Sequence, residues 1–578
     1  MTRTDTFVVG TLVVLLAIVA GLIGVPALQG LNASTTPDPD VVDAPSTRPY
    51  VEGALGEPVS VSPLTASSQV DRDLVALIFA GLVRVGPGGI VVPDLAERWS
   101  ADADGKTWTV ELRDDALWHD GEPVTADDVV YTIRTLQNPD YTGPTAGSWS
   151  EVTVEAVDPR TVIFSLGTPL PGFLHALTQP IAPAHLLADV PVSVLPEHPF
   201  GQQPVGSGPF ALESLTATEA VLVPAITAAI APSPPPDPTA PVTDSLTTMA
   251  PGTRPERPLP YLAGINFRFY MDPEALSADY RAGRLDAASG ISPALAAELG
   301  TTDGSRLLRY PGSTLTTVLL NLRPTHPEFA SPEVRTALLE AIDRSAIIES
   351  AFSMAASTAT GAIPPSSPMF DAVADPPIAY DKKAARTGLK SAGWTEKDDG
   401  WYLPKAKEAL AVEVLSPTES ANPALHAAAK RVVEDWRAIG LNATQTALPP
   451  SQFVTDHLAN GEFAAAVVDV SLGLDPDLYP LLASSQTLTG RSNVIGLQDP
   501  ALDKLLTAAR APGTDEERKA AYLALQQQLA KGRYVLPLAF ADEVVVVHDT
   551  VAGPAIRQVT DPSDRFWDVL TWRLAEDR

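Results

Sequence analysis

Residues able to do catalytic chemistry are present in this chain, but they do not stand at the spacings that catalysis needs. No serine lies in a Gly-x-Ser-x-Gly turn and no lysine follows a serine by three positions, so the common acyl-transfer signatures are missing. No two of the eight histidines lie three to five residues apart, and there is no cysteine. The sequence therefore indicates no catalytic residue, no locally assembled metal site and no cofactor.

Three local patterns that resemble chemical motifs are better explained as structure. His119 and Asp120 are neighbours in an extended segment, so their side chains should point to opposite sides. Asp127 and Asp128 fall in the first turn of a predicted helix, where the helix dipole favours acidic groups. Gly105-Lys106-Thr107 resembles part of a phosphate loop, but it precedes a strand and not a helix. We interpret all three as turns or helix ends.

Composition and charge restrict the class of protein. The 578 residues are 45% apolar and 19% charged, which describes a globular chain of more than one domain. Forty basic and seventy acidic residues give a formal charge of -30. This excess of negative charge argues against nucleic acid or anionic lipid as a partner of the folded body.

The stretch from Leu77 to Leu136 shows its secondary structure clearly. Apolar residues at helical spacing predict a helix that ends near Gly81. Trp108, Val110 and Leu112 alternate with polar residues and predict a half-buried strand. Thr125 is placed to cap a second helix, whose buried stripe is Val129, Ile133 and Leu136.

These elements carry a family resemblance. The runs GLVR, PDLAERW and TVELRDDALWHDGEPVTADDVVYTI resemble the signature of the family 5 extracellular solute-binding proteins, the peptide, dipeptide and nickel receptors of ABC importers. Later runs continue the resemblance in order: PVGSGPFALES, RAGRLDA, NLRPTHPEFASPEVRTALLEAIDRSAII and AARTGLKSAGW. The similarity extends from about residue 50 to the C-terminus.

The resemblance implies an α/β, bilobed periplasmic-binding-protein-like fold of the larger, peptide-receptor type, with an inserted subdomain in the first lobe. Lobe 1 would comprise residues 50–63, 196–312 and 532–578, the inserted subdomain residues 64–195, and lobe 2 residues 313–531. The closing run VLPLAFADEVVVVH should form a strand pair. The Pro-rich segment 224–260 is predicted to be a disordered loop.

The N-terminal segment is predicted to direct the body out of the cytoplasm. Phe7 to Val25 is apolar and long enough to cross a bilayer as a transmembrane helix, with Arg3 ahead of it. We favour a membrane anchor within residues 1–30, and a cleaved signal peptide is the alternative. Residues 31–49 are predicted to form a flexible tether. The body would then lie at the extracytoplasmic face of the membrane, periplasmic or at the cell surface.

The resemblance also implies where a solute binds. In peptide-binding members, a strand of the second lobe carries a Trp and an Asp before an Asp-Pro, and the Asp takes the peptide's amino terminus. The matching run FAAAVVDVSLGLDPDLYP keeps the Asp-Pro but lacks the Trp and the upstream Asp, and no arginine that would clamp a carboxylate is evident. The candidate ligand-binding residues are Asp469 and Asp475 for an ammonium group and, by position, Tyr141, Trp149, Thr314, Thr316 and Asn321.

The function implied is that of the substrate-binding protein of an ABC importer. It would capture a small, peptide or peptide-like solute between two lobes and deliver it to the permease and its ATPase. Two alternatives remain open. One is an exported, membrane-anchored hydrolase. The other is a solute-sensing scaffold that has lost transport, suggested by the incomplete second-lobe strand and the Pro-rich insertion.

Overall fold

The computed structural model describes residues 48–86, 89–144, 149–170, 172–225, 260–473, 475–487, 492–511 and 513–575. The predicted N-terminal transmembrane helix, nearly all of the tether and most of the predicted 224–260 loop lie outside these residues. Within the described ranges, no helix combines the length and the apolar character needed to cross a membrane.

One large mixed sheet connects most of the described chain. Its order is β17-β16-β18-β12-β19-β11-β1-β10-β9-β8, and β13 also pairs with β19. The strands are β1 (Tyr50–Leu55), β8 (Phe210–Leu215), β9 (Glu219–Pro224), β10 (Ile265–Tyr270), β11 (Ala287–Ser289), β12 (Ser305–Leu320), β13 (Ala356–Thr358), β16 (Ala411–Pro417), β17 (Asn442–Leu448), β18 (Ala465–Ser471) and β19 (Val535–His548).

A first apolar core holds the early part of the chain together with its C-terminal part. It packs the β1 end of the large sheet against a four-stranded sheet of order β4-β5-β7-β6. The elements added here are β2 (Val83–Val85), β3 (Val91–Pro93), β4 (Ala96–Ala101), β5 (Thr107–Leu112), β6 (Val152–Asp158), β7 (Thr161–Leu166), α2 (Gln69–Ile78), α3 (Ala126–Leu136), α4 (Phe173–Ala176) and α5 (Ala184–Leu187). Beside it, α6 (Pro273–Arg281) and α7 (Pro293–Leu299) form a smaller core with β11 and β19.

The strand and the second helix predicted for the stretch from Leu77 to Leu136 are confirmed, whereas the first helix, α2, ends at Ile78 and stops short of Gly81. The strand β5 buries Trp108, Val110 and Leu112 and leaves the residues between them half-buried. The helix α3 begins directly after Thr125, whose backbone N–H donates to the Asp128 carboxylate at 2.7 Å. Local sequence was sufficient here because caps and alternation depend on neighbouring residues only.

Two further apolar cores lie on the two sides of β12 and β18. Val318 and Leu320 face the core formed with α8 (Pro332–Glu340), α9 (Arg344–Phe352), α10 (Lys382–Ser391) and α11 (Pro423–Ala438). Leu315 and Leu319 face the core formed with α12 (Tyr479–Leu482), α13 (Pro500–Ala509) and α14 (Asp515–Gly532). This alternation is the expected behaviour of a strand buried on both faces.

Ser331-Pro332 and Asn422-Pro423 each place a capping residue before a proline that can open a helix, and a helix begins at both. Ser331 accepts a hydrogen bond from the Val334 N–H and begins α8, and Asn422 accepts one from the Leu425 N–H at 3.0 Å and begins α11. Trp436 lies in the apolar stripe of α11 and is fully buried, and its indole N–H donates to the Leu338 carbonyl.

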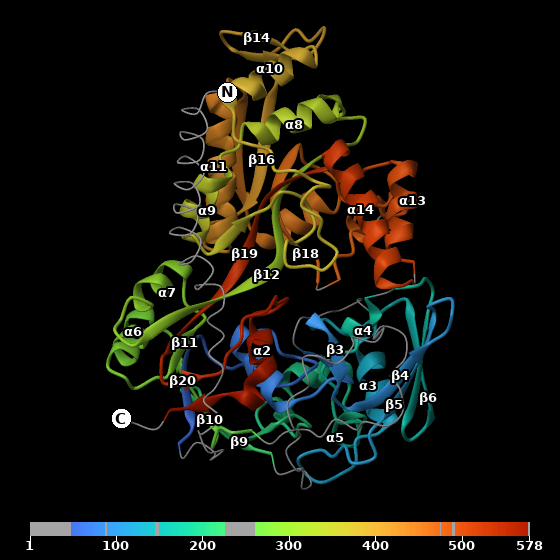
Figure 1. Ribbon diagram of the computed structural model, residues 1–578, viewed down its shortest axis with the longest axis vertical. Helices are drawn as coiled ribbons and strands as arrows, with labels where there is room; N and C mark the ends of the chain where they lie inside the picture. Colours follow the sequence, from blue (N-terminus) through green and yellow to red (C-terminus); the bar gives the residue numbers. More distant parts are fainter. Residues whose placement is uncertain are drawn as a thin grey trace, which may run out of the picture. The chain divides into compact units, whose positions relative to one another are not determined.

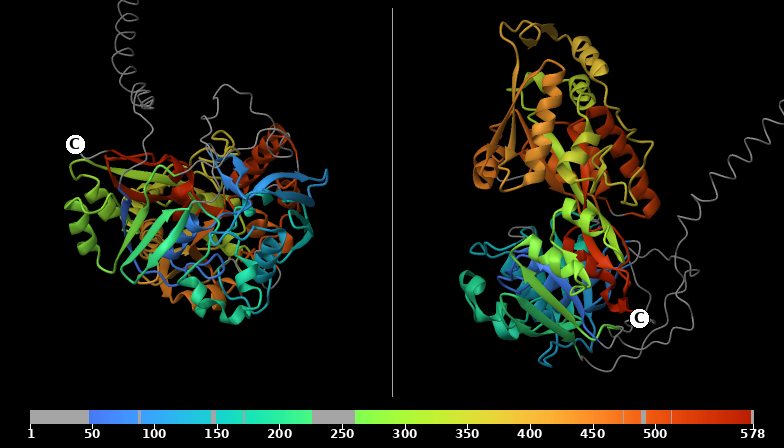
Figure 2. Two further views of the ribbon diagram at one scale, coloured as in Figure 1. Left: turned by 90° about the horizontal axis from the view of Figure 1, so that it is seen from below. Right: turned by 90° about the vertical axis from the view of Figure 1, so that its left-hand side faces the viewer.

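The strands β12 and β19 contribute side chains to the first apolar core and also to the two cores on either side of β12 and β18. They pair antiparallel from Ser305 opposite His548 to Leu319 opposite Val535, and Figures 1 and 2 show them side by side. The prediction of a strand pair for VLPLAFADEVVVVH is wrong, because Asp542 and Glu543 continue the ladder and the run is one strand of 14 residues. The division into lobes at the stated boundaries stays a prediction.

A glycine allows the close approach of these two strands. The register shifts between Pro311 and Leu315, and a Cβ placed on Gly312 would lie 2.2 Å from the Ala541 carbonyl oxygen. We expect Gly312→Ala to lower the free energy of unfolding by about 1–3 kcal/mol, because the backbone must move to relieve the clash. Urea unfolding measures this, with Gly167→Ala as the control, since that Cβ would meet nothing closer than 4.0 Å. Equal losses of unfolding free energy in the two variants would contradict the role given to Gly312.

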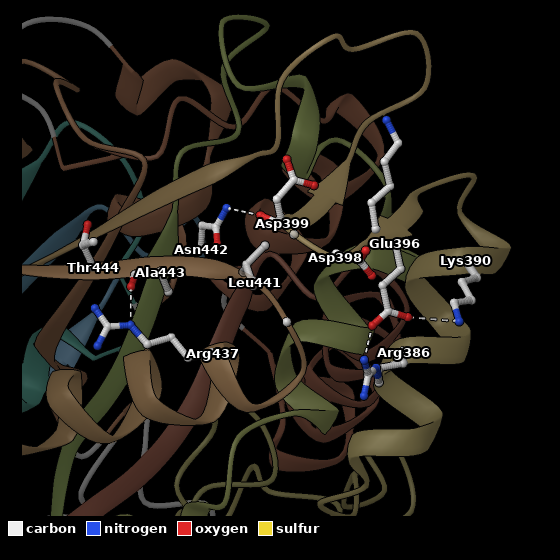
Figure 3. Close-up of a pocket in the computed structure, with 13 residues that line it drawn as sticks. Arg386, Lys390, Glu396, Asp398, Asp399, Arg437, Leu441, Asn442, Ala443 and Thr444 are labelled. Carbon is white, nitrogen blue, oxygen red and sulfur yellow. Dashed lines mark hydrogen bonds and ion pairs between the residues drawn. The ribbon is translucent and has the colours of Figure 1, made fainter.

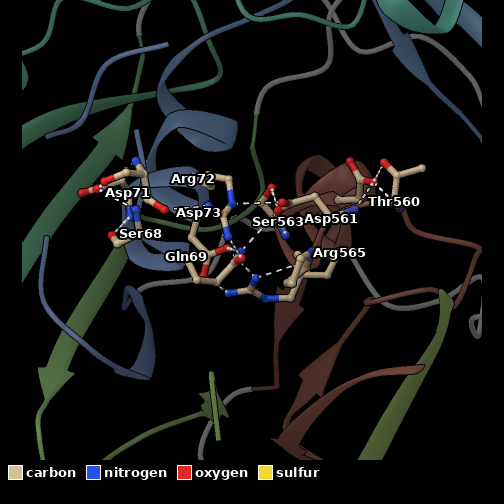
Figure 4. A network of polar contacts seen from close by, with 12 residues as sticks. Ser68, Gln69, Asp71, Arg72, Asp73, Thr560, Asp561, Ser563 and Arg565 are labelled. Atoms are coloured by element: carbon tan, nitrogen blue, oxygen red, sulfur yellow. Dashed lines mark hydrogen bonds and ion pairs between the residues drawn. The ribbon is translucent and has the colours of Figure 1, made fainter. Parts of the chain in front are cut away.

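A buried ionic network fixes the C-terminal helix η7 (Pro562–Thr571) to β1 and α2 (Figure 4). The Arg565 guanidinium lies 2.6 Å from a Glu52 oxygen and 2.7 Å from both Asp73 oxygens. Tyr50 donates its hydroxyl hydrogen to the other Glu52 oxygen at 2.8 Å. The side chains of Arg565, Glu52 and Asp73 are at most 4% exposed, so each charge depends on the others for compensation.

Candidate functional site

The carboxyl ends of three strands meet at one edge of the large sheet. The strand β16 pairs parallel with both β17 and β18, so the three strands end at the same edge. The connection 418–422 leads from β16 into α11 at this edge. In open α/β sheets, ligands bind outside such carboxyl ends.

Asp469 lies at this edge, where two uncharged side chains hold its carboxylate. The Thr316 hydroxyl on β12 donates to its carboxylate at 2.6 Å, and the Asn422 side chain also hydrogen-bonds to it. Asp469 is solvent-exposed, yet the protein surrounds it closely enough that desolvation raises its pKa, and the bonds from Thr316 and Asn422 offset this in part. Among the described residues, no Lys, Arg or His forms an ion pair with it. A carboxylate held in this way suits a cationic group of a solute.

Asp475 is different, because its charge is already neutralised. Its two carboxylate oxygens each lie 2.7 Å from the guanidinium of Arg518, and the side chains of this ion pair are 12% and 8% exposed. The Tyr522 hydroxyl lies 3.4 Å away. A Cβ on Gly172 would approach the carboxylate to 3.2 Å, so Asp475 also contacts that loop. These contacts indicate that Asp475 holds the surrounding structure together.

The structure brings Thr314 and Thr316 to Asp469 but not Asn321. Thr314 pairs in register with Ser471 and Thr316 with Asp469. Asn321 follows the opposite end of β12 and is fully buried. Its amide donates to the carbonyls of Gly461 and Phe463 at 2.9 and 2.8 Å, so it fixes a loop there.

Tyr141 and Trp149 belong to the first apolar core. The Tyr141 hydroxyl lies 2.8 Å from the carbonyl oxygens of Leu64 and Pro144, and burial raises the pKa of Tyr141 to about 12. Trp149 packs against the rings of Phe164 and Phe173, with centroids 6.4 and 6.0 Å away. Contact of either residue with a solute stays a prediction.

The expected separation of His119 and Asp120 is confirmed. The His119 ring contacts the Gly208 carbonyl at 3.0 Å, whereas Asp120 pairs with His185 at 2.9 Å. Both contacts hold loops in place. Within the described ranges, no group of three or more His, Asp or Glu side chains could hold a metal ion.

A pocket near β14 (Thr395–Lys397) and β15 (Gly400–Tyr402) contains none of the candidate residues (Figure 3). Three of its charged side chains are paired with one another. Glu396 binds Arg386 and lies 3.1 Å from Lys390, and Arg437 donates to the Ala443 carbonyl at 2.6 Å.

The comparisons with known proteins identify the class. A family model described as bacterial extracellular solute-binding proteins, family 5 Middle, matches residues 91–493. The chain is 23% identical to the oligopeptide-binding protein AppA of Bacillus subtilis over 91% of both chains. It is 25% identical to the glutathione-binding protein GsiB of Salmonella typhi, over 85% of this chain and 88% of that protein. A putative ABC transporter peptide-binding protein of Brucella ovis is 26% identical over 75% of each chain.

Solved structures support the same fold. The structure of AppA from Bacillus subtilis in complex with a nonapeptide matches with a TM-score of 0.66 at 22% identity, and the match covers 91% of this chain and 99% of that one. The protein described here belongs to the family 5 extracellular solute-binding proteins. The bilobed α/β fold and the solute-binding role expected from the sequence are therefore confirmed. The family consists of receptors and not enzymes, and its members act outside the cytoplasm.

The structure adds Asn422 to the residues around Asp469. Asn422 caps α11 by accepting from the Leu425 N–H, and its side chain also hydrogen-bonds to Asp469. The signal available was its position in the loop after β16, at the edge where parallel strands end.

Proposed function

We propose that this chain captures a peptide or peptide-like solute outside the cytoplasm and delivers it to an ABC permease and its ATPase. The observation that carries the proposal is the Asp469 carboxylate, which is exposed, unpaired among the described residues, and held by Thr316 and Asn422. A peptide's ammonium terminus is the matching group, because it can replace the missing counter-charge. The oligopeptide, glutathione and ABC peptide-binding names of the relatives support the same class of solute.

In this proposal the candidate residues have different roles. Asp469 binds the ammonium group, Thr316 fixes its carboxylate, and Thr314 lies beside it on β12. Asp475, Asn321, Tyr141 and Trp149 shape the surrounding frame through the contacts described above. The apolar run Phe7–Val25 would serve as anchor or export signal.

Incubation with a proteolytic digest of casein tests the proposal. A receptor should bind intact peptides and melt at a higher temperature, with about 2.7 kcal/mol of added stability at a hundredfold excess over Kd. Peptides recovered at unchanged mass support binding, whereas shortened peptides would favour the hydrolase alternative. Cells that lack the chain should also take up less of the bound peptide, unless the chain is a sensing scaffold without a transport role.

The pH dependence of binding follows from the environment of Asp469. Desolvation raises the pKa of this carboxyl above 3.8, so the carboxylate is lost at a higher pH than for an ordinary aspartate. Affinity for a peptide ammonium group should be constant above that pKa and fall as the pH drops through it. Calorimetric titrations between about pH 7 and 4 measure this. The Asp469→Asn variant should show no such fall, and a wild-type affinity that stays flat over this range would contradict the assignment.

A further inference from the structure

Asn422 lies where the loop after β16 enters α11, at the edge of the sheet that carries Asp469. Its side-chain oxygen accepts a hydrogen bond from the Leu425 N–H at 3.0 Å, and its backbone carbonyl accepts one from the His426 N–H at 3.1 Å. Its own backbone N–H donates to the Thr418 carbonyl at 3.0 Å. These contacts fix both the backbone and the side chain of Asn422.

The amide group of Asn422 is used at both of its ends. Because the amide oxygen is turned toward the helix, the amide nitrogen is left to donate elsewhere. It donates to the Asp469 carboxylate, and the Thr316 hydroxyl donates to the same carboxylate from β12 at 2.6 Å. A carboxylate has about four lone-pair sites, so two donors fix its orientation and leave about two sites for a bound group.

The helix α11 is a rigid support for this contact. It has 16 residues, carries a proline in its first turn, and buries Val432, Val433 and Trp436 in the apolar core on its side of the sheet. The Trp436 indole also donates to the Leu338 carbonyl at 3.0 Å. A side chain that a packed helix already holds in place loses little conformational freedom when a ligand binds beside it.

Uncharged donors determine how readily Asp469 ionises. The titratable groups on the neighbouring elements are Glu413 on β16, Glu419 in the loop before α11, and His426 on α11. Among the described residues, no charged side chain contributes to the pKa shift of Asp469. Desolvation raises the pKa of this carboxyl, and the hydrogen bond from Asn422 is one of two that offset the rise, because it favours the ionised form.

We propose that Asn422 is a positioning residue for the solute, because its amide holds the Asp469 carboxylate in the orientation that receives an ammonium group. This inference rests on the proposed function and adds a residue that acts through Asp469. Once a bound solute covers the carboxylate, water no longer replaces the amide donor, so the hydrogen bond matters more in the complex than in the free protein. Asn422 thereby strengthens solute binding and keeps the carboxylate ionised to a lower pH.

Exchange of Asn422 for another good helix cap separates this role from capping. Asn and Ser cap helices about equally well, so Asn422→Ser should melt close to the wild-type temperature. Its shorter hydroxyl does not replace the amide donor to Asp469. Calorimetric titrations between about pH 7 and 4 use one peptide that the wild type retains from a casein digest, with its amino terminus free or acetylated.

Asn422→Ser should bind the free peptide about tenfold more weakly at pH 7, since a hydrogen bond to a charged group is lost. The pH at which its affinity falls to half should also be higher than in wild type. The acetylated peptide should show neither change, because it brings no ammonium group to Asp469. A cap that is only structural would not alter the pH profile.

Asp381→Ser is the matched control. Asp381 caps α10, which packs into the same apolar core as α11, and its carboxylate accepts from the Lys383 and Ala384 N–H groups at 2.8 and 2.9 Å. This exchange should leave both the affinity and the pH profile unchanged. A loss equal to that of Asn422→Ser would show a general effect of cap exchange and would overturn the inference.

The remaining outcomes separate this inference from the proposed function. Wild-type affinity and pH profile in Asn422→Ser would limit Asn422 to capping and leave peptide binding standing. Equal weakening of the free and the acetylated peptide would also overturn the inference, because Asn422 would then not act through the ammonium contact. If Asn422→Ser does not fold, Asn422→Gly decides by the same measurements, since Gly is a tolerated cap without a side chain. A wild type that retains no peptide overturns both proposals.

Discussion

Arg565→Met is expected to lower the free energy of unfolding by about 3–5 kcal/mol, because it leaves two buried carboxylates without a cation. Glu52 is fully buried and Asp73 is 2% exposed, and Arg565 is the only arginine in an ion pair with either of them among the described residues. The contacts of Arg565 with Glu52 and Asp73 join η7 to β1 and α2, and Figure 4 shows the Asp73 side of this network. Its loss therefore also loosens the C-terminal helix. Urea unfolding followed by circular dichroism measures the change.

Two comparisons make this result specific. Arg72→Met removes an exposed ion pair with Asp561, whose side chains are 37% and 34% exposed, and should cost less than about 1 kcal/mol. Arg565→Met combined with Glu52→Gln and Asp73→Asn should recover part of the loss, since no buried charge is then left unpaired. If Arg565→Met and Arg72→Met unfold at the same urea concentration, the network is not the stabilising element described here.

Asp469→Asn is expected to weaken the binding of peptides with a free amino terminus about 100-fold. Asp469 is exposed in the free protein, but a bound peptide covers it, and removing one partner of a covered charge pair costs about 2–5 kcal/mol. The amide keeps the shape and the Thr316 contact without the charge. Calorimetric titration of the same peptide with and without an N-terminal acetyl group measures the effect. The acetylated peptide should bind wild type as weakly as the free peptide binds the variant.

Asp475→Asn is the matched control for this experiment. It removes a charge from the loop that follows β18, but that charge is paired with Arg518. It should therefore lower the melting temperature and leave peptide affinity within a factor of a few. Unchanged affinity in Asp469→Asn together with a large loss in Asp475→Asn would assign the ammonium site to the other aspartate.

The elements that depend on neighbouring residues could be predicted from the sequence. The caps at Thr125, Ser331 and Asn422 and the burial of Trp436 all follow from local spacing. The continuous strand β19 could not be predicted, because Asp542 and Glu543 resemble a break in an apolar run. Only the partner strand β12, more than 200 residues away in the chain, carries the ladder through them.

The candidate site shows the same limit. Asp469 and Asp475 both follow an apolar run, so the sequence could not show which of them is free to bind an ammonium group. The residue that neutralises Asp475 is Arg518 on α14, which is distant in the sequence. Tyr141 and Trp149 stand in a Gly/Pro-rich loop of the kind that often binds ligands. Their burial comes from Leu64, Phe164 and Phe173, and these contacts are not visible in local sequence.

Native mass spectrometry after incubation with a casein digest tests the central claim most directly, which is that the chain binds a solute and leaves it chemically unchanged. The account predicts protein ions with the added mass of an intact peptide, which is released at the same mass when the protein is denatured. Protein ions without added mass, accompanied by shortened peptides in solution, would contradict it.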